Sequence, residues 1–170
     1  MRLILVMFLL VHPLLKNGGD KMSEYTDLVK NPDEWKSIKY DDPRLDAFAT
    51  DVEKRYNLPT GMIVALKNAG ERSNISEVSG KGAKGVMQFI DKTREAYPHD
   101  VNDPFDSIDA SGRYMADLIK QHKNPIAAIA AYNGGTAAAK AVLAGKQPPA
   151  KETREYIKRI QTFLDKKYGQ

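Results

Sequence analysis

The segment between Pro125 and Gly135 constrains the fold more than any other part of the chain. Residues 126–132 follow Pro125 and contain no charged side chain. Proline is favoured in the first turn of a helix, and Asn133-Gly134-Gly135 is typical of a helix end. A helix that is apolar on every side is stable in water only when other elements cover it. The sequence therefore predicts a buried helix inside a helical domain.

Apolar residues recur at helical spacing in several other segments, and no pair of segments shows the alternation of β-strands. We expect helices over 46–57, 58–70, 107–121 and 152–168, a brief helix over 91–97 and an alanine-rich helix over 136–144. Thr60 and Asp91 are the expected caps of the helices that they begin. Residues 73–85 are rich in serine and glycine and fit a loop, and 86–90 fits a strand or a buried turn. These segments predict a mainly α domain.

The first 44 residues are expected to lie outside this domain, so we divide the chain into 1–44 and 45–170. The apolar run Leu3–Leu15 has the length of a signal-peptide core and is short for a membrane span. A signal peptide, a membrane anchor and an upstream start with Met22 as the natural N-terminus all stay open. Residues 16–44 are polar and fit a linker, with Trp35 and Tyr40 packing onto the domain.

The residue types present exclude several kinds of chemistry. The chain has no cysteine, which rules out disulfides, thiolate nucleophiles and cysteine-based zinc sites. Its three histidines are far apart in the sequence, so we expect no metal and no cofactor. The net charge of +4 suits contact with a polyanionic surface such as a bacterial envelope. The basic residues are spread along the chain, so nucleic acid is not an expected partner.

Glu71 is the strongest candidate for a catalytic group. It follows an apolar helical segment and precedes the loop at 73–85. Partial burial disfavours a charged carboxylate, so it raises the pKa and lets the group keep a proton near neutral pH. Protonation of a glycosidic oxygen requires such an acid. On its own this is a weak signal, since a glutamate near a helix end is ordinarily exposed to solvent.

Four short blocks that accompany Glu71 carry a resemblance to a known family. They are Glu71-Arg72-Ser73 with Ser79, Gly85-Val86-Met87-Gln88, Ala131-Tyr132-Asn133-Gly134, and Glu152-Thr153-Arg154-Glu155-Tyr156. In order and spacing they resemble the lytic transglycosylases of the lysozyme-like superfamily, in their soluble and phage-borne forms. The match covers about residues 45–165. It implies a single mainly α, lysozyme-like domain of the goose-type lysozyme and lytic transglycosylase kind.

The resemblance also implies roles for individual residues. Glu71 is expected to be the acid and base, and the expected substrate-binding residues are Ser73, Ser79, Met87, Gln88, Tyr114, Tyr132, Asn133, Glu152 and Tyr156. Plainer roles stay open for some of them: core packing for Met87 and Tyr132, and a helix-start residue for Glu152.

The chain departs from the family pattern at a few positions near these residues. Arg72 intervenes where the family has serine directly after the glutamate, and the loop before Gly85 is about one residue shorter than usual. Val86 replaces the usual leucine, and Gly134-Gly135-Thr136 replaces Ala-Gly-Pro. These differences bear on the geometry of the loop and on the role of Ser73 more than on the identity of the acid.

The resemblance implies cleavage of peptidoglycan between N-acetylmuramic acid and N-acetylglucosamine, with 1,6-anhydro ends as products. One alternative is a hydrolytic lysozyme on the same fold, which needs a second carboxylate such as Glu77, Asp91 or Asp106. Another is a non-catalytic wall-binding or virion structural module. Expected partners are glycan strands, proteins of a phage virion or secretion machinery, and a membrane through the N-terminal segment. We expect a monomer in the periplasm or cell envelope, or on a virion.

Overall fold

The structure is a computed structural model that describes residues 24–169. The predictions for Leu3–Leu15 and Met22 therefore lie outside the described residues. The elements are α1 (Thr26–Val29), the 3-10 helix η1 (Pro32–Glu34), α2 (Pro43–Arg55), α3 (Met62–Ala65), the π-helix η2 (Leu66–Glu71), α4 (Asp91–Ala96), α5 (Pro104–His122), α6 (Pro125–Leu143) and α7 (Lys151–Tyr168). Isolated bridges join Val78 to Lys84 and Lys84 to Phe89. The expectation of a mainly α domain is confirmed.

Three of the longer helices begin with proline behind a polar cap. Asp42, Asp103 and Asn124 each accept hydrogen bonds from backbone amides in the first turn of α2, α5 and α6. Such a side chain satisfies amides that have no partner within the helix, and proline has no amide to satisfy. The expected starts at 46 and 107 were each three residues late, since α2 begins at Pro43 and α5 at Pro104. Two expected caps were also wrong. Gly61, with φ of 81°, precedes α3 in place of Thr60, and Asp91 is the first residue of α4 and not its cap.

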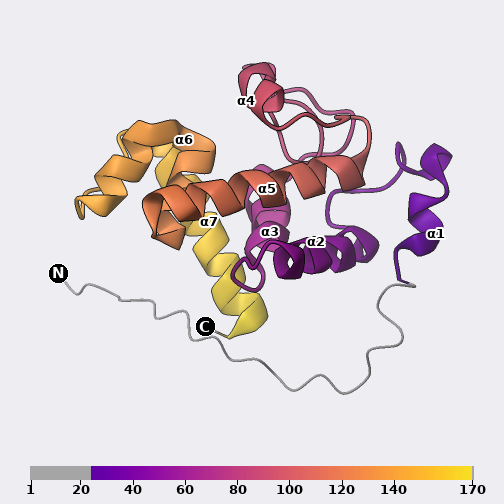
Figure 1. The fold of residues 1–170 in the computed structure, drawn as a ribbon, viewed down its shortest axis with the longest axis horizontal. Helices are drawn as coiled ribbons and strands as arrows, with labels where there is room; N and C mark the ends of the chain where they lie inside the picture. The colour runs from indigo at the N-terminus through magenta and orange to yellow at the C-terminus, as the bar shows by residue number, and fades with distance from the viewer. Residues whose placement is uncertain (1–23, 170) are drawn as a thin grey trace.

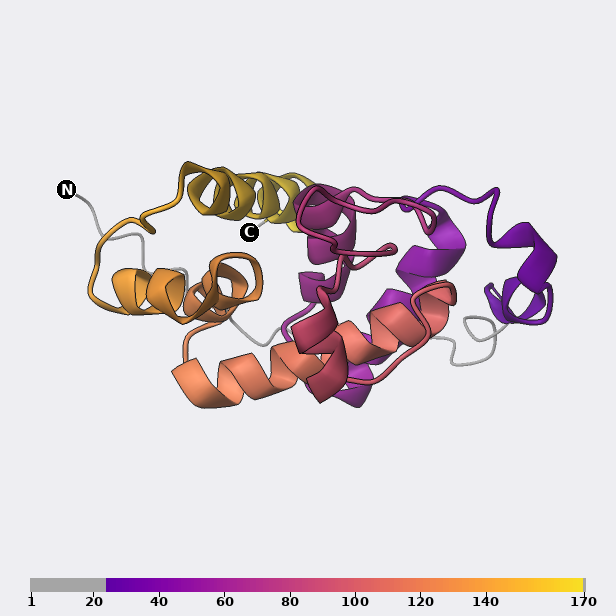
Figure 2. The ribbon, with the colours of Figure 1, turned by 90° about the horizontal axis from the view of Figure 1, so that it is seen from above.

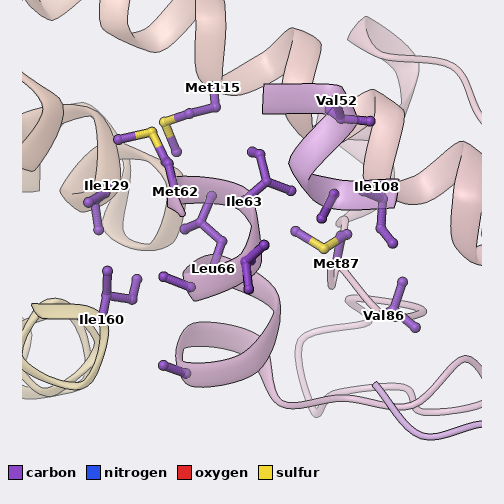
Figure 3. Packing of buried hydrophobic residues seen from close by; sticks show 14 of the residues in the cluster. Val52, Met62, Ile63, Leu66, Val86, Met87, Ile108, Met115, Ile129 and Ile160 are labelled. Carbon is purple, nitrogen blue, oxygen red and sulfur yellow. The ribbon is translucent and has the colours of Figure 1, made fainter. Parts of the chain in front are cut away.

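Helix α3 is the centre of the core. All four of its residues are buried, and α2, α5 and α7 surround it (Figure 1). Figure 3 shows Met62, Ile63 and Leu66 among side chains from the neighbouring helices. The uncharged segment at 126–132 is buried only from Ala127 to Ala131, because Ile126 and Tyr132 lie on a partly exposed side of α6. The enclosed helix is therefore α3.

Helix α6 bends where the sequence predicted a helix end. Gly135 has φ of 70° and ψ of −169°, which is not helical, and the alanine-rich turns continue beyond it to Leu143. Helix α6 packs against α5 and α7 at one end of the molecule, whereas α1 lies at the other end (Figure 1, Figure 2). A side chain at Gly134 would lie 2.6 Å from Oγ1 of Thr153, so glycine permits the close approach of α6 and α7.

Residues 24–44 fold against the helices, although their polar composition indicated a linker. Leu28 is fully buried, and Nε1 of Trp35 donates a hydrogen bond to its carbonyl oxygen at 2.8 Å. The Trp35 ring meets Phe105 of α5 edge-on at 5.9 Å, as expected for a tryptophan that packs onto the domain. The apolar residues of this segment are too widely spaced to show a helical period. Within 24–169, no helix combines the length and the apolar character needed to cross a bilayer.

Candidate active site

Glu71 is the last residue of the π-helix η2, which continues the central helix α3. Widened π-turns are rare and occur often at functional sites. Arg72 ends the turn in the left-handed region with φ of 54° and is exposed, so the residue inserted after the acid points away from the core. Gly70 is required here: a Cβ atom at this position would lie 2.7 Å from the Cζ and hydroxyl of Tyr156.

The carboxyl of Glu71 is held by a tyrosine from the last helix. The hydroxyl of Tyr156 donates to Oε1 of Glu71 at 2.7 Å. Burial raises the pKa of Glu71 from 4.5 to about 7, against the lowering effects of the Tyr156 hydrogen bond and the Arg159 charge. Glu152 acts in the same direction as burial. The carboxyl can therefore be both protonated and ionised near neutral pH, which is what a group that serves as acid and then as base requires.

A cavity of about 180 Å³ opens at this carboxyl. It is lined by Glu71, Ser79, Lys81, Ala83, Gln88, Phe89, Ile90, Thr93, Tyr114, Tyr132, Asn133 and Glu152. Seven of the ten expected site residues are in this set, and they come from η2, the loop after it, α5, α6 and α7. A second cavity of about 290 Å³ lies between α2 and the end of α7 and contains none of them.

The other three expected site residues do not line the cavity. Met87 is fully buried and lies among the core side chains (Figure 3), so the expectation that its side chain contacts substrate was wrong. Its carbonyl oxygen instead accepts a hydrogen bond from the Tyr132 hydroxyl at 3.1 Å. Ser73 is buried and donates to the carbonyl oxygen of Glu71 at 3.1 Å. Tyr156 is buried, and its hydroxyl contacts Glu71. Ser73 and Tyr156 therefore support the acid from the protein interior, without lining the cavity.

Aromatic side chains form one wall of the cavity. Tyr114 of α5 and Tyr132 of α6 are tilted against each other with ring centroids 5.3 Å apart, and Phe89 meets Tyr132 edge-on at 6.2 Å. Burial, followed by the nearby Glu71 charge, raises the pKa of Tyr132 well above its ordinary value. Tyr132 therefore stays a neutral hydroxyl group. An apolar wall with a few fixed hydroxyl groups suits the ring faces of a sugar.

Polar residues in the cavity lining are fixed by hydrogen bonds within the loop after η2 and between α6 and α7. The Ser79 hydroxyl accepts hydrogen bonds from the amides of Lys81 and Ala83, which closes a tight turn. Gln88 has φ of 49°, and its Nε2 donates to the carbonyl oxygen of Gly85 at 2.9 Å. The amide oxygen of Asn133 accepts from Thr153 at 2.8 Å. The residues of the short sequence blocks thus hold one another in place around the cavity.

Several residues at this site carried no signal in the sequence. Lys81 forms an ion pair with Glu152 at 3.2 Å, which joins the loop to the start of α7 at the rim of the cavity. Ile90, which precedes α4, and Thr93 of α4 also line the cavity. Arg159 contacts the backbone of η2 from α7. These contacts join residues far apart in the sequence, so no local pattern points to them.

The fold and the site together define a helical enzyme that acts on glycans with a partly shielded carboxyl acid. A comparison with family models agrees: the transglycosylase SLT domain matches residues 48–157, well over half of the chain. The chain belongs to this family of lytic transglycosylases, which are lyase-type enzymes that cleave peptidoglycan. The matched region contains every residue that lines the cavity and ends just before Arg159.

Burial of the Glu71 carboxyl makes the stability of the protein depend on pH. Its folded pKa of about 7 is above the ordinary 4.5, so the folded state binds the proton more tightly than the unfolded state. The stabilisation is complete below pH 4.5 and is lost as the pH rises through 7. We expect Glu71→Gln to gain stability relative to wild type between pH 4.5 and 8, by at most about 3 kcal/mol.

Urea unfolding at several pH values measures this gain. The exposed Glu95→Gln variant in α4 is the matched control and should follow the wild-type curve. Parallel curves for wild type and Glu71→Gln across this range would contradict a raised pKa at Glu71.

Proposed function

We propose that the protein cleaves the β-1,4 bond between N-acetylmuramic acid and N-acetylglucosamine without water, with Glu71 as its single acid and base. The observation that carries this proposal is one carboxyl with a pKa of about 7 at the floor of an aromatic cavity. We also propose that residues 45–170 form the catalytic unit, against which residues 24–44 pack.

The first step needs a protonated Glu71. Its proton goes to the glycosidic oxygen as the bond to the anomeric carbon of the muramic acid breaks, and the N-acetylglucosamine leaves with a free hydroxyl group. The neighbouring N-acetyl group of the substrate stabilises the positive charge that develops on the sugar. The hydroxyl of Tyr156, 2.7 Å from Oε1, stabilises the carboxylate that Glu71 becomes.

The second step uses the same carboxylate as a base. It takes the proton of the 6-hydroxyl group of the muramic acid, and that oxygen bonds to the anomeric carbon. The product is a 1,6-anhydro sugar, Glu71 is protonated again, and no water is consumed. A group with a pKa near neutrality suits both halves of the cycle, because neither protonation state is strongly disfavoured.

A hydrolytic lysozyme would need a second carboxylate to activate water. Glu77, Asp91 and Asp106 do not line the cavity. Among the described residues, Glu152 is the one other carboxylate in its lining, and it pairs with Lys81 at the rim. These placements favour the reaction without water. A purely wall-binding module would have no need for a carboxyl acid with a pKa raised to about 7.

Digestion of purified sacculi in H₂¹⁸O tests the proposal. Mass spectrometry of the released muropeptides should find 1,6-anhydro ends without ¹⁸O. Reducing muramic acid ends that carry ¹⁸O would establish the hydrolytic alternative, and intact sacculi after prolonged digestion would establish the binding module.

A further inference from the structure

Arg159 of α7 contacts the backbone immediately before the catalytic carboxyl. Its Nε donates to the carbonyl oxygen of Ala69 at 2.9 Å, and its Nη2 donates to that of Gly70 at 3.1 Å. The guanidinium carbon also lies 5.8 Å from the centroid of the Tyr156 ring. One side chain thus touches both residues that precede Glu71 and the tyrosine that binds its carboxyl.

The two carbonyl groups need an external partner. The last carbonyls of a helix have no amide ahead of them within the helix, and buried ones are costly when unpaired. Ala69 and Gly70 are both buried. The planar guanidinium presents two parallel donors, which suits adjacent carbonyls, and a cation is favourable at this end of a helix.

We infer that Arg159 is a positioning residue for Glu71: it fixes the π-turn that carries the acid and, with Tyr156, stabilises the carboxylate formed during the reaction. The inference rests on the proposed role of Glu71. Tyr156 lies three residues before Arg159 on α7, so one helix face supplies both contacts. Displacement of this face would move the backbone and the carboxyl of Glu71 together.

The charges around Glu71 give Arg159 a second effect. Tyr156 and Glu152 from α7 and Tyr132 from α6 face the carboxyl, and Lys81 lines the same cavity. Arg159 is the cation that lowers the pKa of Glu71, against burial and the charge of Glu152. Without that charge the carboxyl is harder to ionise, so the step in which Glu71 gives its proton to the glycosidic oxygen should become slower.

Two variants separate the charge of Arg159 from its geometry. Arg159→Gln removes the charge and keeps an amide donor, whereas Arg159→Lys keeps the charge and loses the paired donors. We expect Arg159→Gln to lower kcat between about tenfold and a hundredfold with little change in KM. Its alkaline limb in the pH–rate profile should move to higher pH. Arg159→Lys should lower kcat, but the alkaline limb of its pH–rate profile should stay near the wild-type position.

The measurements are kcat, KM and the pH profile on purified sacculi, together with an NMR titration of the Glu71 carboxyl without substrate. Exposed Lys158→Gln on the same helix is the control and should match wild type. An Arg159→Gln variant that loses stability but keeps the wild-type kcat per folded molecule and the wild-type alkaline limb of the pH–rate profile would overturn the inference. If the wild type does not cleave peptidoglycan, the proposed function is refuted. A Glu71 pKa that is still higher in Arg159→Gln than in the wild type would then support the electrostatic effect of Arg159 on its own.

Discussion

Glu71→Gln is expected to lower the rate of peptidoglycan cleavage by about three orders of magnitude while the fold persists. Glutamine fills the same space and can still accept a hydrogen bond from Tyr156. It has no transferable proton for the glycosidic oxygen and cannot act as a base on the 6-hydroxyl group. Release of soluble muropeptides from purified sacculi measures the rate, and circular dichroism reports whether the helices remain.

Glu71→Asp tests position separately from chemistry. It keeps the carboxyl but withdraws it by one methylene group, away from the Tyr156 hydroxyl that contacts Oε1. We expect a loss of about a hundredfold in the rate of cleavage, because a displacement of about 1 Å is costly in a preorganised site.

Glu95→Gln is the control for Glu71→Gln. Activity in Glu71→Gln that matches the wild type would remove Glu71 from the mechanism.

The second large effect is expected at Glu53, a buried carboxyl that holds the start of the central helix. Its Oε2 accepts from the amide of Gly61 at 2.7 Å, and its Oε1 accepts from Ile63 at 2.8 Å and Val64 at 3.1 Å. Glu53→Ala would leave these amides at the start of α3 buried without partners. We expect a loss of about 3–5 kcal/mol in the free energy of unfolding, measured with urea.

Glu53→Gln is the matched variant for this prediction. Glutamine keeps one of the two oxygen atoms that accept hydrogen bonds from the backbone amides, so Glu53→Gln should lose less stability than Glu53→Ala. Since α3 continues directly into the turn that carries Glu71, Glu53→Ala should also lose activity. A cost below about 1 kcal/mol for Glu53→Ala would show that the three hydrogen bonds contribute little.

Local signals in the sequence predicted much of this fold. Pro125 marked the start of α6, as expected. Helices α2 and α5 begin at Pro43 and Pro104, three residues before their expected starts, because Asp42 and Asp103 cap them. Gly134-Gly135 marked a break that the structure shows as a bend in α6. The start of α3 was missed because its main acceptor, Glu53, belongs to the preceding helix. The polar segment before α2 was read as a linker because its few buried residues, such as Leu28, are isolated in sequence.

The candidate site was predictable only where short stretches of sequence mark its residues. The short blocks contain Glu71 and five other residues that line the cavity, but they did not distinguish side chains that face it from side chains that support it. Met87 belongs to the core and Ser73 to the turn behind the acid. Arg159 lies outside the blocks, and its contacts with residues 69 and 70 depend on the packing of α7 against η2. Tertiary contacts of this kind leave no periodic signal.

The proposed reaction requires a Glu71 carboxyl that stays protonated to near neutral pH, and an NMR titration of ¹³C-labelled glutamate measures its pKa. The pKa values of Glu71 and Glu53 are both raised to about 7, so the wild type should show two high titrations. Glu71→Gln should abolish one of them and Glu53→Gln the other. A Glu71 carboxyl that instead titrates at its ordinary value of 4.5 would show that burial does not prepare it as the acid.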